Sequence, residues 1–252
     1  MQLENKTIIV TGASSGIGEA AAYVFASEGA NLVLGARRKE ELRRVENTIK
    51  EKGGRAISVV GDAREETFAE QLVEAAENAF GRLHVGFNNA GTMGDMVPVP
   101  DMSADNWRSV VETNLSSAFF AAKHQIPAMK RADGGSIIFT SSFVGHTASF
   151  PGMGAYAAAK AGLIGLVQTL ATEHGADGIR ANALLPGGTK TPMAGDLDNA
   201  DHLGFLKSLH ALKRIAEPAE IARAALFLAS DASSFVTGTA LIADGGNSIN
   251  KV

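Results

Sequence analysis

The 252-residue chain contains no cysteine and no long hydrophobic run. The absence of thiols excludes disulfides, thiolate metal ligands and cysteine nucleophiles. No uninterrupted apolar stretch reaches the length of about 18 residues that a membrane span needs. The beginning, MQLENKTIIVTG, lacks the basic and then apolar pattern of a signal peptide. We therefore expect a soluble, cytoplasmic protein.

The chain also lacks an excess of positive charge. Its net charge of −4 gives no reason to expect nucleic acid or an anionic membrane as a partner. The six histidines show no spacing typical of metal ligands, so no metal site is expected.

Short apolar runs alternate with helical stretches along the whole chain. These runs are continuously apolar, as in strands that are buried on both faces of a parallel sheet. The expected strands cover residues 7–11, 31–36, 56–60, 84–87, 136–140, 180–185 and 240–242. The expected helices cover residues 17–28, 40–52, 65–79, about 103–129, 154–173, about 201–210 and 219–228. Ser103 or Asp105 can cap the fourth helix, and Pro127 is expected to interrupt its last turns. The pattern predicts one doubly wound α/β domain over residues 1–252.

A glycine-rich turn follows the first expected strand and opens the first helix. Gly12, Gly16 and Gly18 are spaced as Gly-x-x-x-Gly-x-Gly, which matches the usual dinucleotide fingerprint only loosely. The position of the turn is nevertheless the one at which a diphosphate binds in doubly wound sheets, on backbone N–H groups at a helix N-terminus. We interpret it as a nucleotide-binding turn.

The end of the second expected strand indicates which dinucleotide binds. NAD sites usually carry an acid here, about 20 residues beyond the turn, whereas this chain has Arg37 and Arg38. Guanidinium groups suit the 2′-phosphate of NADP(H) through charge-assisted hydrogen bonds. The alternative is that both arginines only solvate a helix start, and Ser15 lacks the positive charge found there in many NADP-preferring proteins. NADP(H) is favoured and NAD(H) remains open.

Tyr156 and Lys160 are four residues apart in an Ala-rich run that favours helix, so both side chains project from one face. A nearby cation favours the phenolate form of a tyrosine, whose ordinary pKa is about 10. Ser141 and Ser142 follow the strand just upstream, where a hydroxyl could hold a carbonyl or alcohol oxygen against the phenol. The plain alternative is a surface tyrosine and lysine on an ordinary helix.

Other motifs appear in a fixed order around this pair. Asp62 follows the third strand, and residues 88–91 read Asn-Asn-Ala-Gly after the fourth strand. Asn114 lies in the long helix, and Pro186 and Gly187 follow the sixth strand. With Thr11 to Gly18 reading TGxxxGxG, the chain resembles the short-chain dehydrogenase/reductase family of about 250 residues over essentially its whole length. Ser142 is favoured over Ser141, because the family's serine precedes an apolar-apolar-Gly step.

The resemblance implies a seven-stranded, Rossmann-like sheet of strand order 3-2-1-4-5-6-7 with helices on both faces. It also implies a catalytic tetrad. Tyr156 would be the acid/base, Lys160 would lower its pKa and bind the nicotinamide ribose, Ser142 would orient the substrate oxygen, and Asn114 would hold a water between Lys160 and solvent. The reaction would move a hydride between the nicotinamide and a ketone or secondary alcohol.

The resemblance further implies a row of cofactor contacts. They are Gly12, Ser14, Ser15, Gly16, Ile17, Gly18, Arg37, Arg38, Asp62, Ala63, Asn89, Ala90, Gly91, Tyr156, Lys160, Pro186, Gly187, Thr189 and Thr191. Asp62 would face the adenine and Thr191 the diphosphate. Thr189 replaces the usual valine or isoleucine, and we expect its backbone to keep the carboxamide contact. Relatives assemble as homotetramers or homodimers through long helices such as residues 103–129 and 154–173.

The substrate is less well defined than the reaction. Candidate pocket residues are mostly apolar: Thr92, Met93, Phe143, Phe150, Met153 and Met193, with residues 190–212 as a lid. They weakly favour a hydrophobic ketone or alcohol as the small-molecule substrate. Two alternatives stay open. A 3-oxoacyl-thioester reductase should carry basic residues at the pocket rim, and a non-catalytic dinucleotide sensor should have lost the tyrosine or the lysine.

Overall fold

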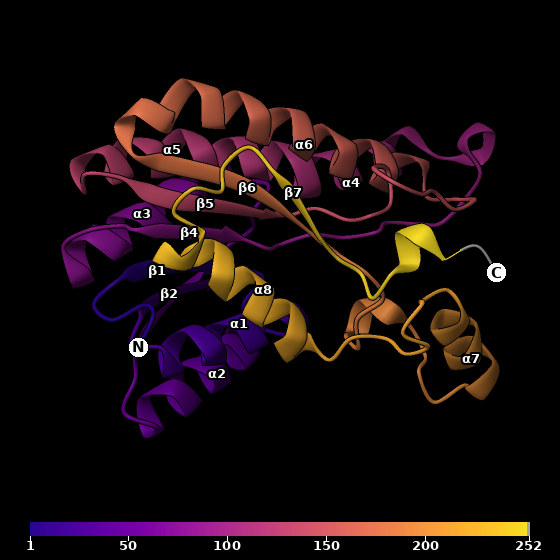
Figure 1. The fold of residues 1–252 in the computed structure, drawn as a ribbon, viewed down its shortest axis with the longest axis horizontal. Helices are drawn as coiled ribbons and strands as arrows, with labels where there is room; N and C mark the ends of the chain where they lie inside the picture. Colours follow the sequence, from indigo (N-terminus) through magenta and orange to yellow (C-terminus); the bar gives the residue numbers. More distant parts are fainter. Residues whose placement is uncertain (251–252) are drawn as a thin grey trace.

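The computed structural model describes residues 1–250 and contains one parallel sheet of seven strands (Figure 1). The strand order is β3-β2-β1-β4-β5-β6-β7. The strands are β1 Thr7–Thr11, β2 Asn31–Ala36, β3 Arg55–Val60, β4 Val85–Asn88, β5 Gly135–Thr140, β6 Ile179–Pro186 and β7 Ala240–Ala243. The predicted fold class and strand order are confirmed. The last two residues of the predicted 1–252 domain lie outside the described residues.

The central strands are buried on both faces, as their continuous apolar sequences predicted. All five residues of β1 are buried. Ile8 and Val10 belong to one hydrophobic core and Ile9 to another, because successive side chains of a strand point to opposite faces of the sheet. The sheet therefore separates two cores, each of which needs its own layer of helices.

Two groups of helices supply these layers (Figure 1). Helices α1 Gly16–Ser27, α2 Lys39–Glu51 and α8 Pro218–Ala229 contribute to the first core. Helices α3 Glu66–Phe80, α5 Ser117–Arg131 and α6 Gly154–His174 contribute to the second. The short helix α4 Ala104–Val111 packs beside α6. Helix α7 Ala200–Ser208 lies apart from both layers, near the C-terminal end of the chain in Figure 1.

The long helix predicted from about residue 103 to 129 differs in two respects. Ser103 caps it by accepting a hydrogen bond from the Asn106 N–H, but a wider π-helical turn, Glu112–Ser116, separates α4 from α5. The expectation that Pro127 interrupts the last turns is wrong, since α5 continues to Arg131. Ile126, Ala128 and Met129 beside the proline are buried in the second core, and this packing holds the turn despite the lost backbone bond.

Within residues 1–250, no helix is both long enough and apolar enough to span a membrane.

Candidate active site

The glycine-rich turn between β1 and α1 has the shape that its sequence predicted. Gly12 and Gly16 adopt positive φ angles of 67° and 59°, which glycine reaches without steric cost. Helix α1 begins at Gly16, and Gly18 lies so close to the turn that an added Cβ would stand 2.3 Å from the Gly12 carbonyl oxygen. The N–H groups at the start of α1 therefore border an open backbone surface suited to an anion.

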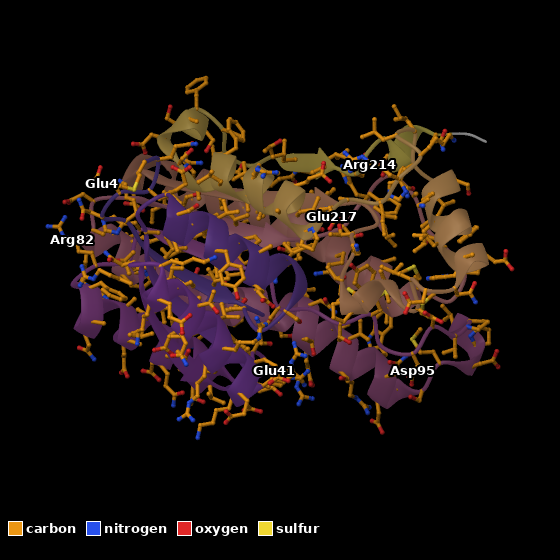
Figure 2. All side chains as sticks on the ribbon, turned by 90° about the horizontal axis from the view of Figure 1, so that it is seen from below. Glu4, Glu41, Arg82, Asp95, Arg214 and Glu217 are labelled. Atoms are coloured by element: carbon orange, nitrogen blue, oxygen red, sulfur yellow. The ribbon has the colours of Figure 1, made fainter. Side chains whose placement is uncertain are left out.

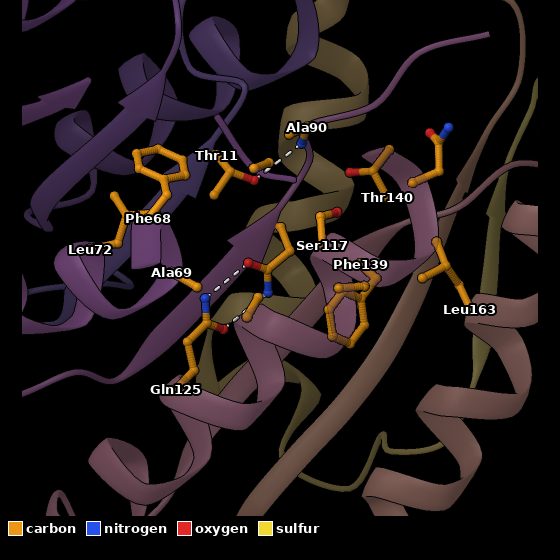
Figure 3. Close-up of a pocket in the computed structure, with 15 residues that line it drawn as sticks. Thr11, Phe68, Ala69, Leu72, Ala90, Ser117, Gln125, Phe139, Thr140 and Leu163 are labelled. Atoms are coloured by element: carbon orange, nitrogen blue, oxygen red, sulfur yellow. Dashed lines mark hydrogen bonds between the residues drawn. The ribbon is translucent and has the colours of Figure 1, made fainter. Parts of the chain in front are cut away.

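The ends of β1, β4 and β5 are tied together beside this turn. The Thr11 hydroxyl accepts hydrogen bonds from the backbone N–H of Asn89 at 3.0 Å and of Ala90 at 3.1 Å, the second of which Figure 3 shows. The Asn89 side chain donates to the Thr11 carbonyl and accepts from the Thr140 hydroxyl. The sequence predicted Asn89 and Ala90 as cofactor contacts and Thr11 as a motif residue, but it gave no sign that Thr11 and Thr140 fix their position.

A small cavity lies behind these strand ends (Figure 3). Its volume is about 20 Å³, and Ala63, Ala90 and Asn114 are among the residues that line it. That is room for about one water molecule. The Asn88 and Gln125 side chains, which also line the cavity, donate hydrogen bonds to each other at 3.0 and 2.9 Å. These bonds provide both buried amides with partners.

Three arginines gather at the ends of β2 and β3. The Arg38 guanidinium donates to the hydroxyls of Ser14 at 2.9 Å and Ser15 at 2.6 Å, and so joins the start of α2 to the glycine-rich turn. Arg37 lies 3.9 Å from the carboxylate of Asp62 and is largely exposed. Positive charge thus borders the glycine-rich turn, where Arg37 and Arg38 were expected.

Arg64 is the third arginine, and the sequence reading missed it. Its guanidinium donates to both carboxylate oxygens of Asp62, with the shortest distance 2.7 Å. These bonds, and a smaller effect of Arg37, hold the pKa of Asp62 below its ordinary value. The signal was present as Asp-x-Arg after the third strand, since a side chain two residues on can reach back to the carboxylate.

Asn114 occupies the middle of the π-helical turn between α4 and α5 and is 2% exposed. Its amide nitrogen donates to the carbonyls of Thr92 and Val110, both at 2.8 Å, and its amide oxygen accepts from the Thr92 N–H at 3.2 Å. Both donors are used, while the oxygen keeps one lone pair. The asparagine therefore clamps the loop after β4, a structural task in addition to the expected holding of a water.

Tyr156 and Lys160 both lie on the inner face of α6, at 8% and 3% exposure. The Lys160 ammonium donates to the Thr140 carbonyl at 2.6 Å and stands 5.6 Å from the centre of the Tyr156 ring. The Ser141 hydroxyl donates to the Lys160 carbonyl, whereas the Ser142 hydroxyl accepts from the Val144 N–H and acts to lower the pKa of the Tyr156 phenol. The two serines thus have different partners, and only the second adjoins the phenol.

Burial dominates the protonation of this pair. It raises the pKa of Tyr156 above 10, while Ser142 acts in the opposite direction, and it lowers the pKa of Lys160 to about 7. The expected lowering of the tyrosine pKa by the lysine is therefore not seen in this structure. Desolvation disfavours the charged forms of both groups, and the ammonium is directed to Thr140 rather than to the phenol oxygen. A buried phenol with a hydroxyl beside it can still exchange a proton with a bound carbonyl or alcohol oxygen.

Within residues 1–250, the turn after β6 leaves the backbone groups of Thr189 without a hydrogen-bond partner. Lys190 N–H donates to the Ala216 carbonyl and Ala216 N–H to the Gly188 carbonyl, which makes Thr189 the paired residue of an isolated parallel bridge. In this pattern the N–H and C=O of Thr189 point away from Ala216. An added Cβ on Gly16 would lie 3.0 Å from the Thr191 methyl group, so Thr191 faces the glycine-rich turn.

An apolar cluster surrounds the phenol. Val110, Phe143, Val144, Ala155 and Tyr156 form its buried part, against which Met93, Phe150 and Met153 pack. The rings of Phe143 and Phe150 meet edge to face, with centroids 6.0 Å apart. Four of the six candidate pocket residues, Met93, Phe143, Phe150 and Met153, thus share one cluster. Met193 lies outside it and is 42% exposed in the short turn Pro192–Ala194. The sequence reading missed Val110, which lies one helical turn before Asn114.

The segment beyond Thr191 is mostly exposed. Helix α7 contains no buried residue, and Phe205 is 57% exposed. Of the basic residues nearby, Arg214 donates to Glu220 through two bonds of 2.7 Å and Lys190 lies 3.7 Å from Glu217. Figure 2 shows Arg214 and Glu217 on the segment that leads into α8. These pairs neutralise two of the basic residues at this rim.

Comparisons with known proteins agree with this arrangement. A family model described as "Enoyl-(Acyl carrier protein) reductase" matches residues 12–248. The cyclohexanol dehydrogenase of Acinetobacter sp. (strain SE19) is 35% identical over 244 residues, which is 97% of this chain and 95% of the relative. The 2,5-dichloro-2,5-cyclohexadiene-1,4-diol dehydrogenase of Sphingobium indicum is 39% identical over 247 residues, 97% of each chain. The crystal structure of a levodione reductase superposes with a TM-score of 0.93 at 32% identity, covering 99% of this chain and 100% of the other.

Proposed function

The chain belongs to the short-chain dehydrogenase/reductase family, and on that premise we propose that it is an NADP(H)-preferring ketone reductase or alcohol dehydrogenase with Tyr156 as its acid/base. It is an oxidoreductase that acts on alcohol or ketone groups with a nicotinamide cofactor, as its relatives are. The observation that carries the finer proposal is a buried phenol beside the Ser142 hydroxyl, at the carboxyl end of the strands that border the glycine-rich turn.

Each member of the tetrad has a task that its surroundings support. In reduction, the Tyr156 phenol donates its proton to the carbonyl oxygen, and in oxidation the phenolate takes the proton of the alcohol. The Ser142 hydroxyl holds the same oxygen in place. Lys160, fixed by the Thr140 carbonyl, resupplies the proton, and the remaining lone pair of the Asn114 amide oxygen holds a water on the path to solvent.

The cofactor, when bound, supplies or accepts the hydride at its nicotinamide carbon. The residues present fit it. The N-terminus of α1 and the glycine-rich turn hold the diphosphate, and the free backbone groups of Thr189 hold the carboxamide. Arg38, supported by Ser14 and Ser15, and the exposed Arg37 hold the 2′-phosphate of NADP(H).

The substrate is a hydrophobic, preferably cyclic, ketone or secondary alcohol. The apolar cluster of Met93, Phe143, Phe150 and Met153 around the phenol supports this choice. The names of two relatives specify six-membered carbocyclic alcohols. Residues 190–212 form the lid over this pocket, with Met193 on its short turn.

An acyl-thioester reductase is the second candidate, because the description of the matching family model names an acyl carrier protein reductase. An acidic carrier would need unbalanced positive charge at the rim, whereas Arg214 and Lys190 are each paired with a glutamate. A non-catalytic sensor is the less favoured alternative, because the tyrosine and the lysine are both present.

We also propose a homotetramer or homodimer. Phe119 on α5 is 52% exposed and Phe235 before β7 is fully exposed, and such large apolar side chains suit a subunit interface. The cytoplasmic location stays a prediction.

The function is tested by NADPH and NADH oxidation against a panel of cyclic and linear ketones and one 3-oxoacyl thioester. We expect turnover of cyclic ketones with NADPH preferred. Preference for the thioester would favour the second candidate, and cofactor binding without turnover of any compound would favour the sensor.

A further inference from the structure

His210 is a buried histidine outside the catalytic tetrad. It lies two residues beyond the end of α7 and is 2% exposed. Buried polar side chains are costly unless their hydrogen bonds are satisfied. The partners of this imidazole therefore indicate what it holds.

Both ring nitrogens have backbone partners of opposite kind. Nδ1 lies 2.7 Å from the carbonyl oxygen of Leu206, which can only accept. Nε2 lies 3.0 Å from the backbone nitrogen of Gly188, which can only donate, and 3.4 Å from the amide nitrogen of Asn247. These partners assign the neutral tautomer with the proton on Nδ1. The ring therefore connects α7 to the turn after β6.

Gly188 is shaped for this contact. A Cβ at this position would stand 2.8 Å from Cε1 of His210, so any larger residue would push the ring away. The carbonyl of Gly188 accepts from the Ala216 N–H at 2.8 Å, while its N–H is held by the histidine. The histidine thus fixes the peptide plane that enters Gly188, and Ala216 fixes the plane that leaves it toward Thr189.

The C-terminal segment also packs against this region, where Asn247 contacts the ring. The Leu212 N–H donates to the Gly245 carbonyl, and the Asn250 side chain donates to the Ser208 carbonyl at the end of α7. Asp244 is the charged group nearby, and its carboxylate is occupied by the Gly246 N–H and by the N–H and hydroxyl of Ser248. The histidine thus stands where α7, the turn after β6 and the C-terminal segment meet.

We propose that His210 is a positioning residue for the nicotinamide half of the cofactor. Its Nε2 holds the Gly188 N–H and so fixes the peptide plane that enters Gly188, which positions the following Thr189 for the carboxamide. Its Nδ1–H ties this turn to the lid helix α7. The inference rests on the proposed function, which assigns Thr189 to the carboxamide.

Two variants separate the two nitrogens. His210→Gln places a side-chain oxygen near the position of Nε2 and can still accept from Gly188. His210→Asn places its amide near the position of Nδ1 and leaves the Gly188 N–H without a partner. An unsatisfied buried donor weakens whatever depends on it, so only the asparagine variant should lose nicotinamide positioning.

The readout is binding of two ligands, measured by fluorescence for NADPH and by calorimetry for adenosine 2′,5′-bisphosphate, which lacks the nicotinamide and its ribose. We expect His210→Asn to weaken NADPH binding roughly tenfold or more and to leave the bisphosphate within about twofold. His210→Gln should stay within about threefold of wild type for both ligands. The proposal would be overturned by unchanged NADPH affinity in His210→Asn, or by an equal loss of affinity for both ligands. It would also be overturned if His210→Gln weakened NADPH binding as much as His210→Asn does.

His84 offers a matched control at the opposite end of the sheet. Its Nδ1 accepts from the Thr7 N–H at 2.9 Å, a bond of the same kind. His84→Phe should lower thermal stability while the ratio of the two affinities stays that of wild type. A protein that bound NADPH as expected but reduced no ketone would contradict the proposed function and leave the binding result for His210 standing. Equal affinities for NADPH in the two His210 variants would overturn the proposal for His210 and leave the proposed function standing.

Discussion

The proposed catalytic tetrad and the proposed lid around α7 lie at the same end of the sheet but are constructed in opposite ways. Asn114, Ser142 and Lys160 are at most 5% exposed and bonded to neighbouring backbone or side-chain groups. Helix α7 has no buried residue, and Phe205 is 57% exposed. Rigid packing suits residues that must meet a reacting atom, and an exposed segment suits one that adapts to a substrate. We infer that the first region defines the reaction and the second tunes the substrate.

The largest expected effect is the loss of the phenol. Tyr156→Phe should reduce kcat by roughly a hundred- to ten-thousandfold, the usual contribution of a general acid or base, with little change in the dissociation constant of NADPH. Steady-state kinetics and fluorescence titration measure the two quantities. Tyr23→Phe is the matched control, since that phenol donates to Glu19 on the outer side of α1 and should leave kcat unchanged. Full turnover in Tyr156→Phe would remove the tyrosine from the mechanism.

The next effect concerns the cofactor. Arg38→Ala removes the guanidinium that Ser14 and Ser15 support, and should lower the ratio of kcat/KM for NADPH to that for NADH by roughly ten- to a hundredfold, because charge-assisted bonds are lost. Arg37→Ala should act in the same direction.

Arg44→Ala is the control for the arginine variants, because it removes the same charge from α2, where Arg44 pairs with Glu19. We expect its cofactor ratio to equal that of wild type. An unchanged ratio in both Arg37→Ala and Arg38→Ala would show that the phosphate is held elsewhere.

The buried lysine gives a smaller, pH-dependent effect. Its pKa of about 7 in the folded protein lies below the ordinary 10.5, so the unfolded chain binds more protons between these values. The free energy of unfolding should therefore rise with pH across this window, by at most about 1.4 kcal/mol per pH unit. Denaturant unfolding of the cofactor-free protein from pH 7 to about 9.5 measures the slope, below the range in which the tyrosines ionise. Lys160→Met should flatten it; an equal slope in the variant would contradict the burial of the ammonium.

The smallest effect is expected in the lid. Phe205→Ala should change KM for a bulky cyclic ketone by a few fold, while kcat for a small ketone and the melting temperature stay within error, since exposed substitutions rarely alter stability. A large fall in kcat for every ketone would mean that α7 belongs with the rigid region, and the contrast between the two would be lost.

The strands and the doubly wound class could be predicted from apolar runs such as Thr7 to Thr11, whereas the strand order was predicted from the family resemblance. Strand β1 and strand β2 have the predicted bounds. The site motifs were also readable, since glycines, the Tyr–Lys pair and the arginines carry local signals. The π-helical turn around Asn114 was not, because it depends on bonds to Thr92 across the loop.

Long-range contacts of this kind also explain the other features that the sequence did not predict. Thr11, Thr140 and His210 act through partners 20 to 80 residues away along the chain, as the Thr11 bond to Ala90 shows. Local rules predicted that Pro127 interrupts the last turns of its helix, yet its buried neighbours keep the helix intact. In each of these cases the local structure depends on tertiary packing, which a local sequence pattern does not predict.

The most direct test follows one hydrogen atom. NADPH that carries deuterium on the transferring face of the nicotinamide is incubated with a cyclic ketone, and the alcohol is analysed by mass spectrometry and NMR. We predict one deuterium on the carbinol carbon of the wild-type product, and no detectable product in the same time with Tyr156→Phe. An alcohol without deuterium at that carbon, or a Tyr156→Phe variant that forms it at the wild-type rate, would contradict direct hydride transfer assisted by the buried phenol.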